Sequence, residues 1–241
     1  MIESFLTQNL IVRGETAIAD YLRTGQSDFS NIWKEAFTDV LIDFDTMGLK
    51  IRQLCERLSL QTSVTKTAAF NGAISKQDYA QRMRLVIPVS AITGNAVFTL
   101  QGTDDDGLNY TAVQLVSDDG TAGTTQTISA TATGNSANSF LITRLYEKYR
   151  LQLISIGTTV TYSAYMIEDI YTTLHRYKTI ANIYRSLMAS VGDEYEGKWK
   201  EYELLYNTLL SKGRFRVDYS DDSEISEAEG EKHFANIRFT V

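Results

Sequence analysis

The residues best suited to chemistry form an acidic run near the end of the chain, from Asp218 to Glu229. Oxygen-bearing residues recur there at the spacing of a calcium-binding loop, which coordinates about six to eight oxygens along a tightly turned backbone. Positions one, three, five, nine and twelve would supply side chains, and position seven a carbonyl. The candidate ligands are Asp218, Ser220, Asp222, Glu224, Ser226 and Glu229.

Two features of this run argue against a bound ion. Ser223 stands at position six, where calcium loops carry glycine because the backbone turns sharply. The segment Gly213–Val217 also interrupts the helix that would lead into the loop. The alternative is a solvated acidic turn in which Ser226 caps a short helix. The sequence therefore leaves open a protein with no cofactor and one that holds Ca²⁺ here.

The sequence offers little else for catalysis. Its two histidines, His175 and His233, are far apart and lie in no metal-binding spacing. Cys55, the single cysteine, falls on the apolar stripe of a predicted helix, which is typical of a buried residue. Gly120–Gly123 lacks the lysine and the spacing of a phosphate-binding loop. We therefore expect no enzyme, although a carboxylate pair assembled from distant segments would escape this search.

The composition excludes several classes of protein. Of the 241 residues 43% are hydrophobic, which is enough for a buried core. The net charge of −7 argues against a nucleic-acid coat and against a polybasic membrane anchor. No apolar stretch reaches the length of about 18 residues that a membrane span needs. The first twelve residues lack the pattern of a secretion signal, and a single cysteine fits a reducing compartment.

Charge and composition set the middle of the chain apart from its two flanks. Between Arg84 and Arg144 there is no lysine or arginine, and Thr, Ser, Gly and Asn are frequent. Short β-forming segments alternate there with turn sequences at a spacing of about ten residues, which is typical of a β-sandwich. The expected strands are Arg84–Val89, Ala96–Gln101, Tyr110–Val116, Thr124–Thr133, Tyr149–Ser155 and Thr159–Tyr162.

Two local features of this region make sharper predictions. Gly157 and Thr158 separate two strand segments by two residues, which predicts a β-hairpin. Pro88, the only proline, has no N–H to donate to a neighbouring strand. We therefore expect the first strand to lie at a sheet edge.

Both flanks repeat apolar residues at three- and four-residue spacing, which predicts helices. Ser27 or Asp28 can cap a long N-terminal helix, and Gly213 can end the last one. A strand-forming sequence, IRFTV, closes the chain. The expected helices are 15–23, 28–58, 164–190 and 193–213, and the expected strand is 237–241.

The sequence thus predicts an α+β protein with a discontinuous helical bundle domain. An antiparallel, immunoglobulin-like β-sandwich is inserted into this domain, and a short strand ends the chain. Insertions of this kind are tolerated when the two ends of the inserted domain lie close together. The predicted parts are 1–80, 81–163 and 164–241, the last with the acidic run and the terminal strand.

Roughly the last hundred residues resemble the adaptor, or head-completion, proteins in the head–tail connector of tailed bacteriophages. The resemblance rests on the aromatic-rich helix 164–190, on a second helix with Trp199 and Tyr206, and on the acidic run before a terminal strand. The segments Phe140–Arg150 and Thr161–Ile167 also resemble adaptors that carry an inserted sandwich.

This resemblance implies a structural virion protein of the neck, assembled in the host cytoplasm. Such adaptors form a ring, commonly of twelve copies, between the portal protein and a tail terminator or stopper protein. DNA passes through the channel without sequence-specific binding, and the sandwich could contact capsid or fibres. A C-terminal segment inserts against the portal, and its counterparts here are Ile237, Arg238, Phe239, Thr240 and Val241.

Two other functions remain open from the sequence. One is a tail-completion or fibre-anchoring protein of the virion, in which the sandwich binds the partner. The other is a calcium-dependent carbohydrate-binding module, which would need Trp33 and Trp199 at the surface. Both tryptophans fall on apolar stripes of predicted helices, which favours packing in a core.

Overall fold

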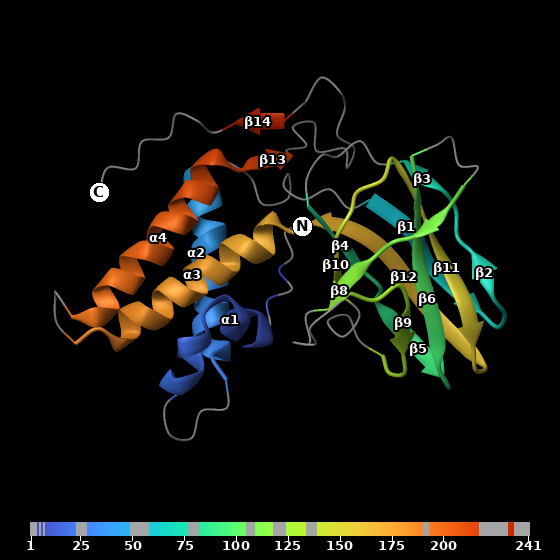
Figure 1. The fold of residues 1–241 in the computed structure, drawn as a ribbon, viewed down its shortest axis with the longest axis horizontal. Helices are drawn as coiled ribbons and strands as arrows, with labels where there is room; N and C mark the ends of the chain where they lie inside the picture. Colours follow the sequence, from blue (N-terminus) through green and yellow to red (C-terminus); the bar gives the residue numbers. More distant parts are fainter. Residues whose placement is uncertain are drawn as a thin grey trace. The chain divides into compact units, whose positions relative to one another are not determined.

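The computed structural model describes residues 4, 6, 8–22, 28–48, 58–76, 82–104, 109–117, 124–133, 139–189, 193–216 and 231–233. The chain forms two units (Figure 1). Met1–Glu56 and Ile170–Val241 make up a helical unit, and Arg57–Asp169 make up a unit of β-strands. The α+β class predicted from the sequence is confirmed.

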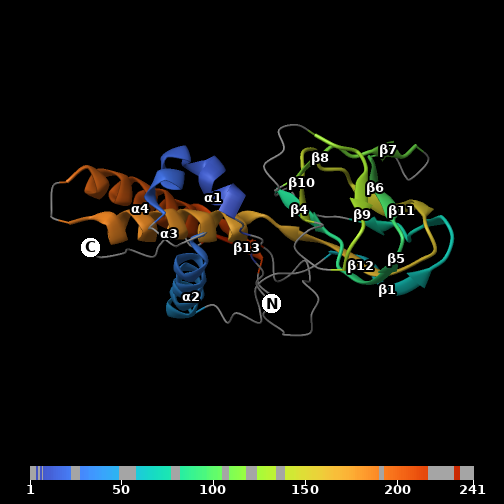
Figure 2. The ribbon, with the colours of Figure 1, turned by 90° about the horizontal axis from the view of Figure 1, so that it is seen from below.

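Both ends of the chain contribute to the helical unit. Helices α3 and α4 run side by side, and α2 packs against α3 (Figures 1 and 2). None of the helices in the described part of the chain is both long and apolar enough to cross a membrane. The elements are α1 (Gln8–Gly14), the 3-10 helix η1 (Thr16–Tyr21), α2 (Ser30–Thr46), α3 (Ile170–Leu187), α4 (Glu194–Lys212), β13 (Arg214–Arg216) and β14 (Glu231–His233).

The ends of α4 follow the capping chemistry expected from the sequence, whereas α2 has Phe29 as its N-cap residue, without a side-chain cap, and ends at Thr46 instead of near residue 58. The Asp28 carboxylate accepts a hydrogen bond from the backbone N–H of Ser30, at 2.9 Å, where α2 begins. Asp193 caps α4 by accepting from the N–H groups of Tyr195 and Glu196, at 3.0 and 3.1 Å. At the other end of α4 the N–H of Gly213 donates to the carbonyl of Leu209. The predicted limits of this helix are therefore confirmed.

Aromatic rings dominate the core of the helical unit. Phe44 of α2 makes edge contacts with Tyr171 of α3 and Phe215 of β13, at centroid distances of 6.0 and 5.1 Å. All three side chains are fully buried. The first strand of the β13–β14 hairpin is thereby packed into the same core as the helices.

The start of α3 differs from the prediction. Residues 164–168, expected to be helical, complete strand β12, and the helix begins at Ile170. Met166 pairs with Leu85, and Ile167 with Arg84, in the neighbouring strand. The last five residues of this strand are all buried. A segment buried on both faces shows no alternation of apolar and polar residues, so its apolar residues could be mistaken for a continuation of the helical spacing of α3.

The β-unit consists of two antiparallel sheets. In the first, the strand order is β1-β12-β4-β10-β8, and β5 also pairs with β12. In the second, the order is β2-β11-β6-β7, while β3 pairs with β11 and β9 with β6. The first sheet contains β1 (Leu58–Lys66), β4 (Met83–Val86), β5 (Val89–Thr93), β8 (Leu115–Ser117), β10 (Ser139–Ile142) and β12 (Thr159–Glu168). The second contains β2 (Phe70–Asn71), β3 (Ser75–Lys76), β6 (Ala96–Thr103), β7 (Thr111–Ala112), β9 (Ile128–Ala130) and β11 (Lys148–Ile156).

Side chains from both sheets share one apolar core. Along β11, buried Tyr149, Leu151 and Leu153 alternate with partly exposed residues, as in a strand with one face inward. Phe98 of β6 meets Tyr162 of β12 edge to face, at a centroid distance of 4.8 Å, which joins the two sheets. The unit is therefore a β-sandwich.

The sandwich is longer than predicted at both ends. It begins at Arg57 and ends at Asp169, where the sequence predicted 81 and 163. Leu58–Lys66, placed in the helical part, forms β1 and pairs with β12. This segment has the polar, β-branched composition of an edge strand, but it follows directly on the helical apolar pattern of residues 28–58.

The predicted hairpin at Gly157 is wrong. Strands β11 and β12, which flank Gly157 and Thr158, belong to different sheets, so the turn carries the chain across the sandwich. The turn at Gly94 does the same between β5 and β6. The two turns are bonded together, since the N–H of Gly157 donates to the carbonyl of Asn95 at 2.7 Å.

The expected position of Pro88 is also wrong. Its strand is interior, because β4 pairs with both β10 and β12. The proline lies between β4 and β5, where the ladder to β12 is interrupted. Its carbonyl accepts the N–H of Ser163 at 3.0 Å, but the proline has no N–H to return the bond. The sheet accommodates the proline by a break in the strand instead of an edge position.

Candidate functional site

The acidic run lies outside the described residues, but its two flanks do not. Strands β13 and β14 stand directly before and after it and pair antiparallel, with Arg216 opposite Glu231. A calcium loop of the helix–loop–helix type has a helix on each side, and here both flanks are strands. The candidate ligands Asp218 to Glu229 and the predicted portal-binding residues Ile237 to Val241 all fall outside the described part of the chain.

Metal-binding chemistry is not found elsewhere in the residues that the structure describes, where no group of three His, Cys, Asp or Glu side chains could hold an ion. His175 is buried in the helical core. Its Nδ1 is 2.7 Å from the Ser4 hydroxyl, and its Nε2 contacts the carbonyl oxygen of Trp33. Burial lowers the pKa of His175 to about 4.

The bond from His175 to the Trp33 carbonyl identifies Nε2 as the protonated nitrogen, since a carbonyl can only accept. Nδ1 then accepts from the Ser4 hydroxyl. A hydroxyl hydrogen-bonded to a neutral imidazole is also the arrangement of a nucleophile and its general base. The ring is 4% exposed and packs against Phe37, so this pair is placed to join the N-terminal segment to α3.

The tryptophans lie where the sequence predicted. Trp33 and Trp199 are half-buried and pack against the apolar cluster formed by α1, η1, α3 and α4. Tyr184 and Tyr202 stack in the same cluster, with ring planes 20° apart. Both indole rings therefore pack against this cluster, as the apolar stripes favoured. Cys55 lies outside the described residues, and of His233 only its position in β14 is described.

Among the described residues of the helical unit, the most exposed large apolar side chain lies on helix α4. Leu204 is 68% exposed and the adjacent Leu205 is 39% exposed. On the inner side of the same helix, buried Tyr206 donates its hydroxyl hydrogen to Asp43 of α2, at 2.6 Å. The helix is thus fixed on one side and presents an apolar surface on the other. We call Leu204 and Leu205 the α4 leucines.

Charged side chains border the α4 leucines and pair with one another. Lys200 lies 2.6 Å from Glu196, one turn away, and Lys198 lies 3.4 Å from Glu201. A small apolar centre with a paired, polar surround is typical of a protein–protein interface. The sequence pattern placed Leu205 on the apolar stripe of the helix and left Leu204 off it, and it did not single out either leucine as an exposed surface residue.

Ion pairs also fix the other helices of the unit. Lys178 of α3 lies 3.3 Å from Glu203 of α4. Asn182 of α3 donates to Asp39 of α2 at 3.1 Å. The hydroxyl of Tyr202 and the ammonium of Lys198 both donate to Glu15, which precedes η1. Polar bonds therefore connect α2, α3, α4 and the N-terminal segment into one framework around the aromatic core.

Comparison with known proteins gives little further guidance. The family models contain none that matches the chain, and no curated protein matches it. Among solved structures, the crystal structure of the SPBc2 prophage-derived protein YomS matches 47% of this chain and 93% of that one, at 12% identity and a TM-score of 0.32. A likeness at this level carries no argument about function.

Proposed function

We propose that this chain is a non-enzymatic structural protein of a tailed-phage virion, an adaptor that assembles as a ring in the neck. The portal protein would lie on one side of the ring and a terminator or stopper protein on the other. The resemblance of the last hundred residues supports this role. The observation that carries it furthest is the pair of α4 leucines on an otherwise tightly bonded helical unit.

The α4 leucines fit the contact that a ring requires. In a ring, one face of each copy meets a different face of the next, so an apolar surface can remain exposed on the single chain. Burying a leucine side chain contributes about 1.5–3 kcal/mol. Leu204 is 68% exposed in the single chain, so most of this stabilisation is gained only when the next copy in the ring covers the side chain.

The β13–β14 hairpin suits a connection to a second partner. Phe215 is fully buried in the helical core, so the hairpin starts from a fixed point. The strand-forming end of the chain follows β14 in sequence. Addition of such a strand to the sheet edge of a partner would bind it through backbone hydrogen bonds. We propose the portal as that partner.

A second role in the virion rests on a different observation. In the described part of the sandwich two large apolar residues are exposed, Ile74 at 55% and Ile154 at 43%. In a tail-completion or fibre-anchoring protein these would bind the partner, and the α4 leucines would not. The two roles therefore predict opposite effects for substitutions in the two units.

Paired substitutions separate these roles. Full-length chain is mixed with portal rings, and bound protein is measured by sedimentation for the wild type, Leu204→Asp and Ile154→Asp. The adaptor role predicts at least a tenfold loss of bound protein for Leu204→Asp and wild-type binding for Ile154→Asp, since a buried carboxylate is costly in an apolar contact. Wild-type binding by Leu204→Asp would contradict the adaptor role, and a wild-type chain that does not bind portal rings at all would favour the fibre-anchoring role.

A further inference from the structure

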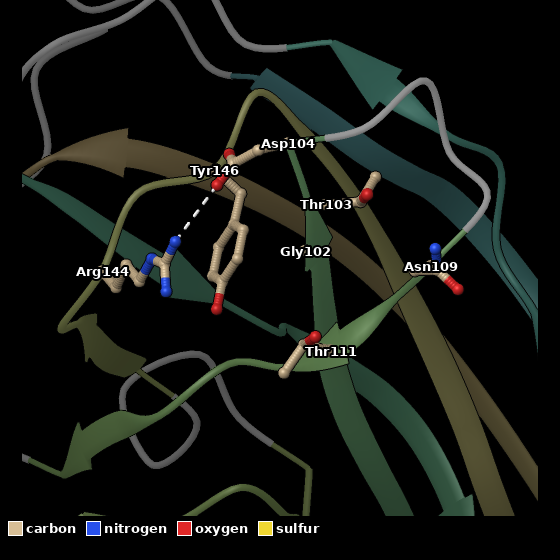
Figure 3. A pocket seen from close by; sticks show the side chains of 7 residues that line it. All are labelled: Gly102, Thr103, Asp104, Asn109, Thr111, Arg144 and Tyr146. Carbon is tan, nitrogen blue, oxygen red and sulfur yellow. Dashed lines mark hydrogen bonds and ion pairs between the residues drawn. The ribbon is translucent and has the colours of Figure 1, made fainter.

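A hollow opens at one end of the β-sandwich, at the end of β6. Its volume is about 350 Å³, within the range of roughly 300–1,000 Å³ that is usual for small-molecule sites. Figure 3 shows Arg144 on one side of the Tyr146 ring and Asn109 and Thr111 on the other. The hollow is lined by Gly102, Thr103, Asp104, Asn109, Thr111, Arg144 and Tyr146.

The wall of this hollow is formed before any ligand binds. Gly102 pairs with Tyr149 of β11 and with Thr111 of β7, so the three residues share one face of the sheet. Gly102 has no side chain, and the Tyr146 ring fills that space; a Cβ on Gly102 would lie 2.4 Å from the ring. The N–H of Tyr146 donates to the buried hydroxyl of Tyr149 at 2.7 Å. Tyr146 is therefore held from two sides.

The charges of the hollow cancel within it. The Arg144 guanidinium lies 3.2 Å from one carboxylate oxygen of Asp104. The other oxygen of Asp104 accepts the backbone N–H of Glu147 at 3.0 Å. Arg144 also lies over the Tyr146 ring, 4.8 Å from its centroid. An anion or a cation would have to compete with this pair, so the lining favours a neutral ligand.

We propose that this hollow binds a neutral saccharide. A sugar presents hydroxyl groups that both donate and accept, and the lining offers a carboxylate, a guanidinium, an amide and hydroxyls within one small volume. Arg144 lies over one side of the Tyr146 ring, and the other side, toward Asn109 and Thr111, is the aromatic surface for the apolar C–H face of a sugar ring. The hollow is open and partly polar, which suits binding of one or two sugar units with modest affinity.

This proposal concerns the sandwich by itself and does not rest on the adaptor role. It also differs from the module considered from the sequence, because it needs neither calcium nor the two tryptophans. On a virion, such a site would let the sandwich contact a glycan surface. The polar side chains that line the hollow, not a metal ion, would recognise the hydroxyl groups of the sugar.

Saturation-transfer difference NMR on the full chain tests the proposal, since it detects weak binding. Glucose, galactose and N-acetylglucosamine are the neutral probes, and inorganic phosphate, followed by ³¹P line width, is the charged one. The expected result is transfer to at least one neutral sugar and no broadening of phosphate. Binding of phosphate alone, or of no probe, would overturn the proposal.

Three variants locate the signal. Arg144→Gln removes the ion pair with Asp104. The double variant Asn109→Ala/Thr111→Val alters only exposed residues, so this variant should keep the fold and test the site even if Arg144→Gln does not fold. Thr158→Val is the matched control, because Thr158 is exposed in a turn at the opposite end of β6 and β11. We expect at least a tenfold loss of sugar affinity in the double variant and none in the control. Equal signals in the two would show that the sugar binds elsewhere and would refute the assignment.

Discussion

At the scale of single residues, His175 makes the helical unit sensitive to acid. The folded unit holds the imidazole neutral, with a pKa of about 4, while the unfolded chain has the ordinary value of 6.5. The unfolded state therefore binds the proton first as the pH falls. Stability from this group is fully present above pH 6.5 and is lost as the pH falls to about 4.

The pKa of His175 differs by about 2.5 between the folded and the unfolded chain, so the free energy of unfolding should fall by about 3 kcal/mol over this pH range. His175→Gln removes the titrating group, so the difference in unfolding free energy between wild type and variant should shrink by about that amount from pH 7 to pH 4. Fluorescence during urea unfolding measures it for this unit alone, because both tryptophans lie there. A difference that stays constant with pH would contradict the account.

Buried Arg84 forms a close ion pair with Asp169 in the sandwich. Its Nε and Nη2 both donate to Asp169, at 2.9 and 2.7 Å, and its Nη1 donates to Ser139 at 3.1 Å. The side chains of Arg84 and Asp169 are 3% and 8% exposed. Removal of Arg84 leaves the buried Asp169 carboxylate with the more distant and exposed Arg82, at 3.9 Å, so the cost should approach the roughly 3–5 kcal/mol of a broken buried ion pair.

Arg84→Met should therefore unfold the sandwich at markedly lower urea concentration, as measured by circular dichroism. The double variant Arg84→Met/Asp169→Asn should recover part of the lost stability, because it removes both charges of the pair. A double variant no more stable than Arg84→Met would show that the ion pair is not the cause.

At the scale of elements, the paired turns at Gly94 and Gly157 determine how the sandwich is connected. Gly94 has φ +87°, and a Cβ there would lie 3.2 Å from the Cα of Gly157. Both backbone strain and close approach thus require glycine. Gly197, in α4, has nothing within 4 Å of its Cβ position.

The two glycines predict effects of opposite sign. Gly94→Ala should destabilise the sandwich by about 1–2 kcal/mol, the usual cost of a left-handed backbone for an L-residue. Gly197→Ala should stabilise the helical unit by about 1 kcal/mol, since glycine is a poor helix former. Urea midpoints of the two transitions measure both. A stabilised Gly94→Ala sandwich would contradict the assigned geometry.

The sequence predicted correctly the features that are set by residues close together in the chain. Asp193 and Gly213 act within one helical turn, and both limits of α4 were predicted. The strand partners of Gly157 and Pro88 are set by pairings distant in sequence, and both predictions failed. Asp104 follows β6 and Arg144 follows β10, about 40 residues apart in the chain, so the hollow that they line could not be found by spacing. The exposure of Leu204 also depends on what α4 packs against, which the helical pattern alone does not decide.

At the scale of the whole molecule, we propose a subunit that assembles without calcium. Removal of calcium is then expected to have no effect. Excess EGTA should leave both portal binding and the urea midpoint of the helical unit unchanged, relative to buffer with calcium. A chelator-dependent loss that calcium restores would show that Asp218 to Glu229 hold an ion and that the ion matters for assembly.

The central claim, assembly on a portal, is tested most directly by weighing portal rings before and after addition of the full-length chain. Single-particle mass measurement is suitable because it counts the chains on each ring. The account predicts a discrete increase that equals a closed ring of 27.1 kDa subunits. Portal rings of unchanged mass, at chain concentrations in large excess, would contradict it.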